Sequence, residues 1–292
     1  MIKFKKPILI AEIGCNHMGD IEIAKKMIET AAESGADYVK FQKRNNKYLL
    51  GDDYNKPHPV PENSFANTYG LHREFLEFNV SQHKKLSKFC KKKNIKYATS
   101  VWELISAKDI INSKIEMDFI KVPSACNLDF ELLGHLVKNF KKKIHVSTGM
   151  TKDNEISKIV KFFKKNNRFK DLVLYICTSD YPAKDEDICL LEINRIKNKY
   201  KLNNHQLGFS GHHLGIAVDP IAYSLGAQYV ERHFTLDRTL KGTDHAASLE
   251  PTGLKKLKRN LVVAFKALDY KTKSGLLKNE MFQRKKLKRI LL

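Results

Sequence analysis

Short apolar runs and longer amphipathic stretches alternate along the whole chain. Each apolar run is followed by apolar positions at helical spacing and then by a short polar break. The runs that we predict as strands are PILIAEIG, DYVKFQ, KYATSV, DFIKVPS, IHVSTG, LVLYICTS, QLGFSGH and QYVERHF. The patterns that we predict as helices include residues 21–35, 81–94, 103–113, 130–143 and 154–168, and a final one over 252–268.

This alternation predicts the fold class. Strands that alternate with helices form right-handed βαβ units around a parallel sheet. Eight such units in 292 residues favour an α/β fold, a single-domain (β/α)8 TIM barrel. The alternative is a doubly wound sheet, but that fold usually has a G-x-G-x-x-G first turn, and the turn here reads GCNHMGD. We therefore predict a barrel over residues 1–270 and a basic C-terminal tail over 271–292.

Composition excludes several other classes of protein. Hydrophobic residues make up 42% of the chain, which is enough for a full core, and no apolar run approaches the roughly 18 residues that a membrane helix needs. The N-terminal apolar segment is short, meets Glu12 and lacks a small-residue cleavage site, so we interpret it as a strand. Five cysteines without C-x-x-C spacing indicate a reducing, cytoplasmic protein rather than a disulfide framework.

The formal net charge of +21 raises the question of a nucleic-acid partner. Only nine of the 53 basic residues are arginines, and arginine provides most bidentate recognition of bases and phosphates. The densest lysine runs, at 91–93, 141–143 and 164–165, lie at the C-terminal ends of predicted helices, where cations complement the helix macrodipole. We therefore expect no nucleic-acid partner and no membrane partner, and we expect these lysines on the barrel face opposite the active site.

Polar side chains interrupt the apolar runs at one consistent end. In a barrel, catalytic residues lie at the C-terminal ends of the strands, and a buried charge is costly unless it is paired or used. The residues at these ends are Glu12, Lys40, Gln42, Ser100, Lys121, Ser124, Ser147, Thr178, Ser179, Tyr181, Ser210, His212, Glu231 and His233. We predict an active site at this end of the barrel.

Two lysines and several hydroxyls at these strand ends suggest an anion site. Lys40 and Lys121, with Ser124, Ser147 and Ser210, could hold a small phosphorylated or carboxylated anion. The alternatives are that each lysine pairs with a carboxylate of a neighbouring strand, or that one of them forms a Schiff base. Matching positions on two strands favour the anion site.

The last two strands each end in a histidine. His212 and His233 should lie side by side over the barrel mouth, where they could hold a divalent metal. Glu231 shares a strand face with His233 and could be a ligand, an orienting carboxylate or a lysine partner, whereas His213 should point elsewhere. The cysteines near this mouth could form a zinc site with histidines, but small buried side chains are the favoured interpretation.

The ordered motifs resemble one known family. The motifs AEIGCNHMGD, YVKFQ, FIKVPSA, VSTGM, CTSDYP, GFSGHH, ERHFTLDR and KGTDHAASLEP, from about Ile8 to Glu250, resemble the N-acetylneuraminate (sialic acid) synthase family. The resemblance implies a barrel enzyme that joins phosphoenolpyruvate to an aldose such as N-acetylmannosamine and releases phosphate. It also implies a divalent cation, Mn2+, Mg2+ or Co2+, held by two histidines, which His212 and His233 match.

The resemblance also implies roles for individual residues. The catalytic set would be Glu12, Lys40, Lys121, His212 and His233. The phosphoenolpyruvate site would comprise Lys40, Lys121, Ser124, Ser147 and Ser210. Ser179, in place of a family asparagine, would also face the anion. The sugar site would comprise Glu12, Gln42, Tyr181 and Asp244.

Several departures from the family pattern concern the sugar. Residues 123–126 read PSAC where the family commonly reads GSGE, and Gly211 replaces an aspartate. No residue is carried over from the segment between Arg44 and Ser81, which differs from the family. Family members usually continue into a small antifreeze-like domain, which this chain is expected to lack, either as a single-domain variant or as a truncated product. The family also implies a homodimer.

Two other functions remain open at this point. The first is a pyruvate-dependent aldolase that uses a Schiff base or a metal, with Lys121 or Lys40 as the nucleophile. The second is a non-catalytic barrel that acts as a binding or scaffold subunit, suggested by the altered motifs.

Overall fold

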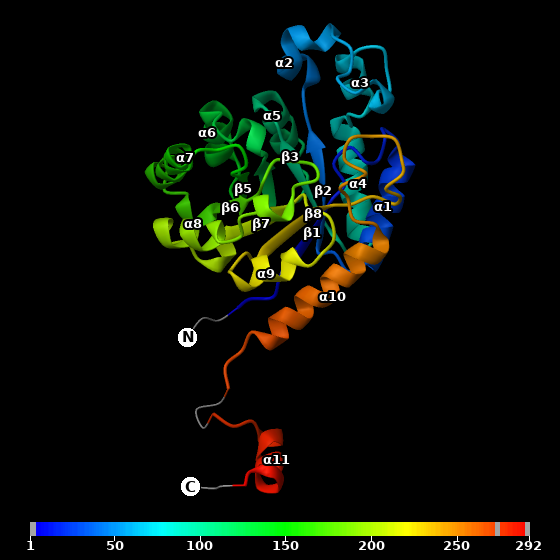
Figure 1. Cartoon of the computed structure of the whole chain (residues 1–292). Helices are drawn as coiled ribbons and strands as arrows, with labels where there is room; N and C mark the ends of the chain where they lie inside the picture. Colours follow the sequence, from blue (N-terminus) through cyan, green and yellow to red (C-terminus); the bar gives the residue numbers. More distant parts are fainter. Residues whose placement is uncertain (1–3, 272–274, 290–292) are drawn as a thin grey trace.

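The computed structural model of the chain, which describes residues 4–271 and 275–289, is a closed barrel of parallel strands (Figure 1). Neighbouring strands pair in sequence order, and β8 closes the barrel by pairing with β1. The prediction of a (β/α)8 barrel is confirmed. The strands are β1 (Ile8–Glu12), β2 (Tyr38–Lys43), β3 (Lys96–Val101), β4 (Phe119–Val122), β5 (Lys143–Ser147), β6 (Leu172–Ile176), β7 (Leu207–Gly211) and β8 (Tyr229–His233).

Helices surround the barrel, and those predicted from the sequence end close to their predicted boundaries. They are α1 (Ile21–Glu33), α4 (Val80–Lys92), α5 (Leu104–Asn112), α6 (Phe130–Asn139), α7 (Asp153–Lys165), α8 (Glu192–Tyr200), α9 (Val218–Ser224) and α10 (Pro251–Ala267). The prediction for 130–143 was too long, because Phe140 already has extended backbone and Lys143 begins β5. The short helices α8 and α9 were not among the predicted ranges.

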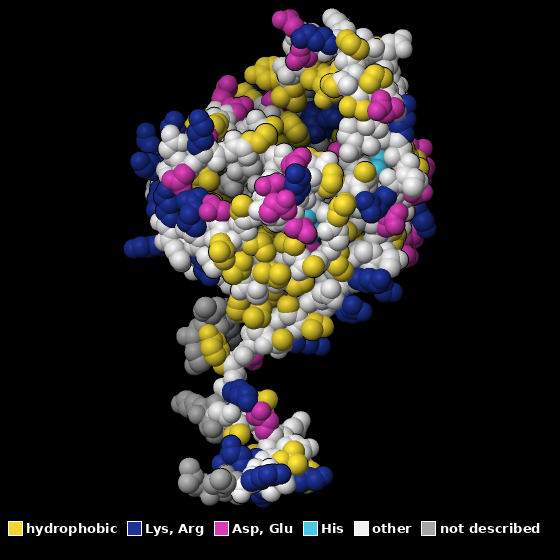
Figure 2. Space-filling view, in the orientation of Figure 1, with side chains coloured by type: hydrophobic (Ala, Val, Ile, Leu, Met, Phe, Trp, Pro, Cys, Tyr) yellow, Lys and Arg dark blue, Asp and Glu magenta, His cyan; other side chains and the backbone are white. Residues whose placement is uncertain are grey.

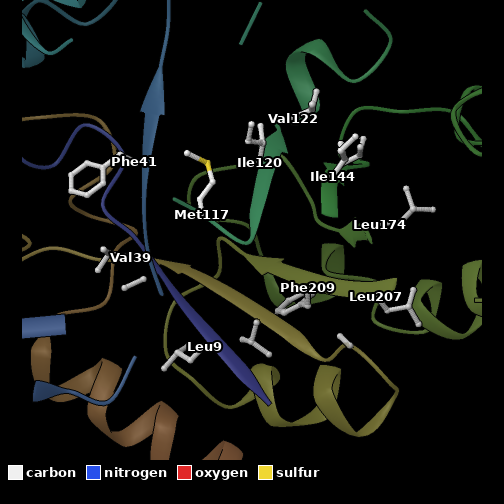
Figure 3. Close-up of a cluster of buried hydrophobic side chains, with 14 of the residues drawn as sticks. Leu9, Val39, Phe41, Met117, Ile120, Val122, Ile144, Leu174, Leu207 and Phe209 are labelled. Carbon is white, nitrogen blue, oxygen red and sulfur yellow. The ribbon is translucent and has the colours of Figure 1, made fainter. Parts of the chain in front are cut away.

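The core has two layers, one inside the barrel and one between the barrel and its helices. Aromatic residues such as Phe119, Tyr175 and Tyr229 fill the barrel interior. Aliphatic residues on the opposite faces of the strands pack against the helices, and Figure 3 shows Leu9, Val39 and Ile120 among them. Alternation along each strand assigns residues to the two layers, because successive side chains point to opposite faces.

The strand register brings the polar strand ends together. Glu12 is the pairing partner of Lys40 on β2 and of His233 on β8. Ser210 on β7 is paired with Glu231 in the same way. Parallel strands of similar length therefore place the predicted site residues at one rim of the barrel.

A long excursion follows β2 before α4 begins. It contains α2 (Asn46–Leu50), two short 3-10 turns and α3 (Tyr69–Phe75). Figure 1 shows this blue-to-cyan segment standing above the carboxyl end of the barrel. Because the segment has no simple periodic pattern, the sequence did not predict its helices, yet it lies where substrates would enter.

The predicted basic tail contains one helix, α11 (Lys278–Leu287), which has no buried residue. Figure 1 shows α11 apart from the barrel, beyond the end of α10. The domain boundary at residue 270 stays a prediction, and residues 1–3, 272–274 and 290–292 lie outside the described residues. Within the described ranges, no helix is both long and apolar enough to cross a bilayer.

Candidate active site

A cavity of about 380 Å³ opens at the carboxyl end of the barrel. It collects side chains from all eight strand ends or the loops that follow them. The predicted site residues all line it, namely Glu12, Lys40, Gln42, Lys121, Ser124, Ser147, Ser179, Tyr181, Ser210, His212, His233 and Asp244. The geometry thus brings the whole predicted set together, and the role of each residue is taken up below as a proposal.

Buried ion pairs form the floor of this cavity. The Lys40 Nζ lies 2.5 Å from Glu12 Oε2 and 3.6 Å from Glu231 Oε1, and it donates to the Ser100 hydroxyl at 3.1 Å. The Lys121 Nζ lies 2.6 Å from Glu231 Oε1. Both lysines are therefore paired with carboxylates of other strands, as one of the alternative interpretations predicted, while their ammonium groups still face the cavity.

The opposite charges in this network stabilise the ionised form of each partner. Burial alone would raise the pKa of Glu231, but the ammonium groups of Lys121 and Lys40 outweigh it and hold that pKa at about 2. Burial lowers the pKa of Lys121, although the charge of Glu231 opposes this change. A carboxylate that stays ionised keeps its lysine partner in place, so the network holds fixed positive charge at the cavity floor.

Two serines and a cysteine surround Gly149 closely at the ends of β4, β5 and β6. The Gly149 amide donates to the Ser124 hydroxyl at 3.0 Å, and the Ser124 Oγ lies 3.4 Å from the Cys177 Sγ. A Cβ at position 149 would overlap the Ser179 hydroxyl and would lie 2.8 Å from Ser124 Oγ. Glycine is therefore required here, because the hydroxyls approach the backbone too closely for a side chain.

The two histidines lie side by side at the ends of β7 and β8, as predicted. Their ring centroids are 5.8 Å apart, and the Tyr181 ring stacks on His212 at 4.2 Å. The His212 Nδ1 lies 2.6 Å from the Thr178 carbonyl oxygen, so this nitrogen donates and Nε2 carries the lone pair. Burial, followed by the neighbouring charge of His233, lowers the pKa of His212 to about 3.

Asp244 lies next to these histidines, on the loop after β8. Its Oδ2 is 3.8 Å from the His233 Nδ1, and its Oδ1 accepts from the Thr243 hydroxyl at 3.0 Å. Burial would raise the pKa of Asp244, but His233 and nearby donors hold it below its ordinary value. In the described ranges, no group of three or more His, Cys, Asp or Glu side chains is arranged to hold a metal by itself.

His213 points away from the cavity, as predicted. Its Nε2 lies 3.0 Å from the Arg232 Nη1, which also donates to Asp219 Oδ2 at 2.7 Å. Arg232 and Asp219 are fully buried between β8 and α9. The alternation of Glu231, Arg232 and His233 along β8 thus separates a structural ion pair outside the barrel from two cavity residues inside it.

Four cavity residues, two arginines and two aromatic residues, were not predicted from the sequence. Arg44 and Trp102 directly follow β2 and β3, and Tyr69 and Arg73 come from α3. The Arg44 guanidinium lies over the Trp102 ring, with its Cζ 3.9 Å from the ring centroid. The positions of Arg44 and Trp102 just after strand ends could have indicated them, whereas nothing in the α3 sequence pattern points to a barrel mouth.

A larger cavity of about 580 Å³ lies at the other end of the barrel. It is enclosed by the lysine-rich face of α4 and by the loop before β4, and its lining includes Lys84, Lys88, Tyr97 and Met117. The start of β3 forms its floor. Active sites of this fold lie at the carboxyl ends of the strands, and this cavity holds none of the predicted site residues.

Comparison with known proteins identifies the family. The model of the NeuB family matches residues 27–273. The chain belongs to the NeuB family. This membership confirms the resemblance to sialic acid synthases that the strand-end motifs suggested.

Curated relatives of this NeuB family member come from animals and bacteria. N-acetylneuraminate-9-phosphate synthase of Drosophila melanogaster is 36% identical over 254 residues, which are 85% of this chain and 65% of that protein. N,N'-diacetyllegionaminic acid synthase of Campylobacter jejuni is 36% identical over 255 residues, 87% of this chain and 75% of that protein. The chain thus spans about two thirds to three quarters of the length of these two relatives.

A solved structure supports the same assignment. The N-acetylneuraminic acid synthetase of Leptospira borgpetersenii, crystallised in complex with citrate, is 27% identical and superposes with a TM-score of 0.81. The match covers 98% of this chain and 94% of that chain. The NeuB barrel is therefore shared along almost the whole length of both structures.

Proposed function

We propose that this NeuB family member condenses phosphoenolpyruvate with the open-chain form of an aldose to give a 2-keto-3-deoxy sugar acid and phosphate. The observation that carries this proposal is the shared cavity, in which the two lysines of the floor, a ring of hydroxyls and two adjacent histidines meet. The names of two relatives, synthases of N-acetylneuraminate 9-phosphate and of N,N'-diacetyllegionaminic acid, agree with it.

The cationic floor and the serines would bind phosphoenolpyruvate. Each ammonium group has three N–H donors, and the ion pairs of Lys40 and Lys121 leave donors for the anion. Hydroxyls from Ser124, Ser147, Ser179 and Ser210 surround the same space and would complete the hydrogen bonds to its carboxylate and phosphate oxygens. Because Glu231 remains an ionised partner of both lysines, they would stay positioned while substrate enters and product leaves.

The two histidines fit a divalent cation. The His212 Nδ1 donates to the Thr178 carbonyl, which leaves the Nε2 lone pair, 3.5 Å from the Ser210 hydroxyl, to face a ligand. Over the described ranges of the chain, the buried His233 Nδ1 has no hydrogen-bond partner, and Asp244 Oδ2 lies 3.8 Å from it. We propose that His212 and His233 hold the metal, with Asp244 nearby. A bound Mn2+, Mg2+ or Co2+ would supply Lewis acidity to the aldehyde oxygen of the sugar.

The remaining residues would orient the sugar and transfer a proton to its aldehyde oxygen. Carbon 3 of phosphoenolpyruvate forms a bond to the aldehyde carbon, whose oxygen gains a proton. Water then adds at carbon 2, and the tetrahedral intermediate expels phosphate. Glu12, which accepts from the Gln42 amide at 2.6 Å, would hold a proton near the aldehyde, and Gln42, Tyr181 and Asp244 would bind sugar hydroxyls.

A substrate screen tests this function. Purified protein is incubated with phosphoenolpyruvate, Mn2+ and a panel of plain and N-acylated hexoses with their 6-phosphates, while phosphoenolpyruvate consumption and phosphate release are followed. Release that needs both substrates, and that a chelator abolishes, supports the proposal. The absence of phosphoenolpyruvate consumption with every acceptor in the panel would refute it.

The aldolase alternative predicts a covalent Schiff base between a lysine and pyruvate, which can be detected chemically. A Schiff-base lysine must lose its proton to attack a carbonyl, but the Nζ atoms of Lys121 and Lys40 each lie at ion-pair distance from a carboxylate, which favours the protonated amine. The structure therefore offers no specific support for that reaction. Borohydride treatment in the presence of pyruvate would add mass to the chain if a Schiff base forms, and an unchanged mass would exclude it.

A further inference from the structure

One wall of the active-site cavity carries two arginines that the proposed phosphoenolpyruvate seat does not use. Arg44 follows β2 and is buried, and Arg73 projects from α3 and is half-buried. Both line the cavity beside Tyr69 and Trp102. Buried or cavity-facing arginines are normally paired, so their partners matter for the chemistry of this wall.

Neither guanidinium has a carboxylate partner in the part of the chain that the structure describes. The Arg44 Nη1 lies 3.4 Å from the Cys15 Sγ, and its Nη2 donates to the Gln42 amide oxygen. Among the described residues, the Arg73 guanidinium takes part in no hydrogen bond and no ion pair. Burial lowers the pKa of Arg44, and the positive charge of Arg73 lowers it further, so the two cations are close enough to repel each other.

Among the described residues, Glu77 and Asp244 act on Arg73 through their charge but form no ion pair with either guanidinium. Glu77 lies 2.9 Å from Lys43 Nζ and accepts from the Arg44 backbone amide, not from its guanidinium. Asp244 accepts from Thr243 and lies beside His233. The Trp102 Nε1, which belongs to the same wall, is buried without a hydrogen-bond partner. In the ranges that the structure describes, the Arg73 guanidinium and the Trp102 Nε1 therefore have no acceptor, and the Arg44 guanidinium has only the uncharged partners Gln42 and Cys15.

The strand order separates this wall from the serines of the phosphoenolpyruvate seat, although Lys40 of that seat lies on β2 itself. In a closed barrel of eight strands, β2 lies across the mouth from β6. The hydroxyls of Ser124, Ser147 and Ser179 come from the ends of β4, β5 and β6, whereas Ser210 and the two histidines come from the ends of β7 and β8. Phosphoenolpyruvate bound by the serines would leave the two arginines without a ligand. A sugar whose aldehyde lies beside the histidines could contact the arginines with the end of its chain remote from the aldehyde.

We propose that Arg44 and Arg73 bind a phosphate group carried by the acceptor aldose, at the end remote from its aldehyde. This inference rests on the proposed condensation and names the acceptor class, a phosphorylated sugar. A phosphate monoester is a dianion with three free oxygens, so it can accept from two guanidinium groups at once and offset both charges. The Trp102 Nε1 would donate to the same group or to its ester oxygen.

The comparisons do not decide between phosphorylated and neutral acceptors. Two relatives at the same identity of 36% carry names of a 9-phosphate synthase and of a synthase without that phosphate. The inference therefore depends on the arginine pair of this chain and not on overall similarity.

The test compares two acceptors and three proteins. Phosphoenolpyruvate consumption is measured with N-acetylmannosamine and with its 6-phosphate, for the unmodified chain, Arg73→Gln and Arg44→Lys. We expect the unmodified chain to prefer the 6-phosphate, and we expect Arg73→Gln to lower kcat/KM for it by about 10- to 100-fold, as the loss of a charged hydrogen bond predicts. The kcat/KM for the neutral sugar and the KM for phosphoenolpyruvate should not change.

The matched control is Arg259→Gln, on the exposed side of α10. This variant should leave kcat/KM unchanged for both acceptors.

Each other outcome has a distinct meaning. Equal losses with both acceptors, or a raised KM for phosphoenolpyruvate, would place the arginines in another role and overturn the inference. A preference of the unmodified chain for the neutral sugar, or for a hexuronic acid, would overturn the phosphate assignment while leaving the condensation intact. No consumption with any acceptor would instead refute the proposed function. Because Arg44 is buried and could affect folding, Arg73→Gln is the deciding variant and Arg44→Lys supports it.

Discussion

The Lys121 Nζ lies 2.6 Å from Glu231 Oε1 in the barrel interior, and their side chains are only 4% and 5% exposed. The pair joins β4 to β8 across the barrel, so it is both a part of the cavity floor and a long-range tie in the fold. Pairs of this kind stabilise little overall, but losing one partner leaves an uncompensated charge.

We predict that Lys121→Met destabilises the protein by about 3–5 kcal/mol, because Glu231 then retains only the more distant Lys40. Adding Glu231→Gln should recover much of that loss of stability without restoring activity. Urea denaturation at neutral pH measures both effects.

The control for this pair is Lys96→Met, which removes the exposed ion pair of Lys96 with Asp118 at a similar distance of 2.6 Å. It should cost about 0–1 kcal/mol. If Lys121→Met costs no more than Lys96→Met, the buried pair does not have the energetic role described here.

The sequence was sufficient to predict the barrel and the strand-end residues. A period of two places Glu231 and His233 on one face of β8, and parallel pairing brings every strand end to the same rim. The sequence offered the lysine–carboxylate ion pairs only as an alternative to an anion site. The register between the strands decides which carboxylate lies next to Lys40 and which next to Lys121, and the sequence does not give that register. The position of Arg73 could not be predicted from the sequence. Arg73 belongs to α3, in the segment between β2 and α4, and this segment has no periodic pattern that would place it over the barrel mouth.

A second prediction concerns Gly149 among the serine hydroxyls. Gly149→Ala introduces a methyl group that overlaps the Ser179 hydroxyl and crowds Ser124, so we expect a KM for phosphoenolpyruvate raised by about tenfold or more, as a misplaced anion contact predicts. Steady-state kinetics at saturating acceptor measures this change. In Gly134→Ala, on α6, the new methyl group would meet only the Phe162 ring, at 3.8 Å. This variant should leave KM unchanged, and an equal effect of both variants would contradict a local cause.

A third prediction concerns metal binding by the two histidines. His212→Ala and His233→Ala should each weaken Mn2+ binding by more than about tenfold, because each removes a proposed ligand. Calorimetric titration with Mn2+ measures this without relying on activity. His135→Ala, on α6 and remote from the mouth, should bind Mn2+ like the unmodified protein. Unchanged binding in both cavity variants would remove these histidines from the metal site.

The last prediction concerns stability in acid. His17 stacks on Phe78 with ring centroids 3.9 Å apart, and the His83 Nδ1 lies 2.6 Å from the Tyr97 hydroxyl. Burial lowers the pKa of each histidine from 6.5 to about 3. Between these pH values the unfolded chain binds protons that the folded chain does not, so stability must fall as the pH decreases from about 6.5 to about 3.

Replacing one of these histidines separates their effect from general acid sensitivity. His83→Gln removes one titrating group and should reduce the slope of unfolding free energy against pH by about 1.4 kcal/mol per pH unit in that window. Tyr97→Phe deletes the hydroxyl partner but keeps the histidine, so it should lower stability while leaving the slope unchanged. Urea unfolding at several pH values measures both quantities. An unaltered slope in His83→Gln would show that His83 is not held neutral by burial, because a histidine with an ordinary pKa titrates alike in both states.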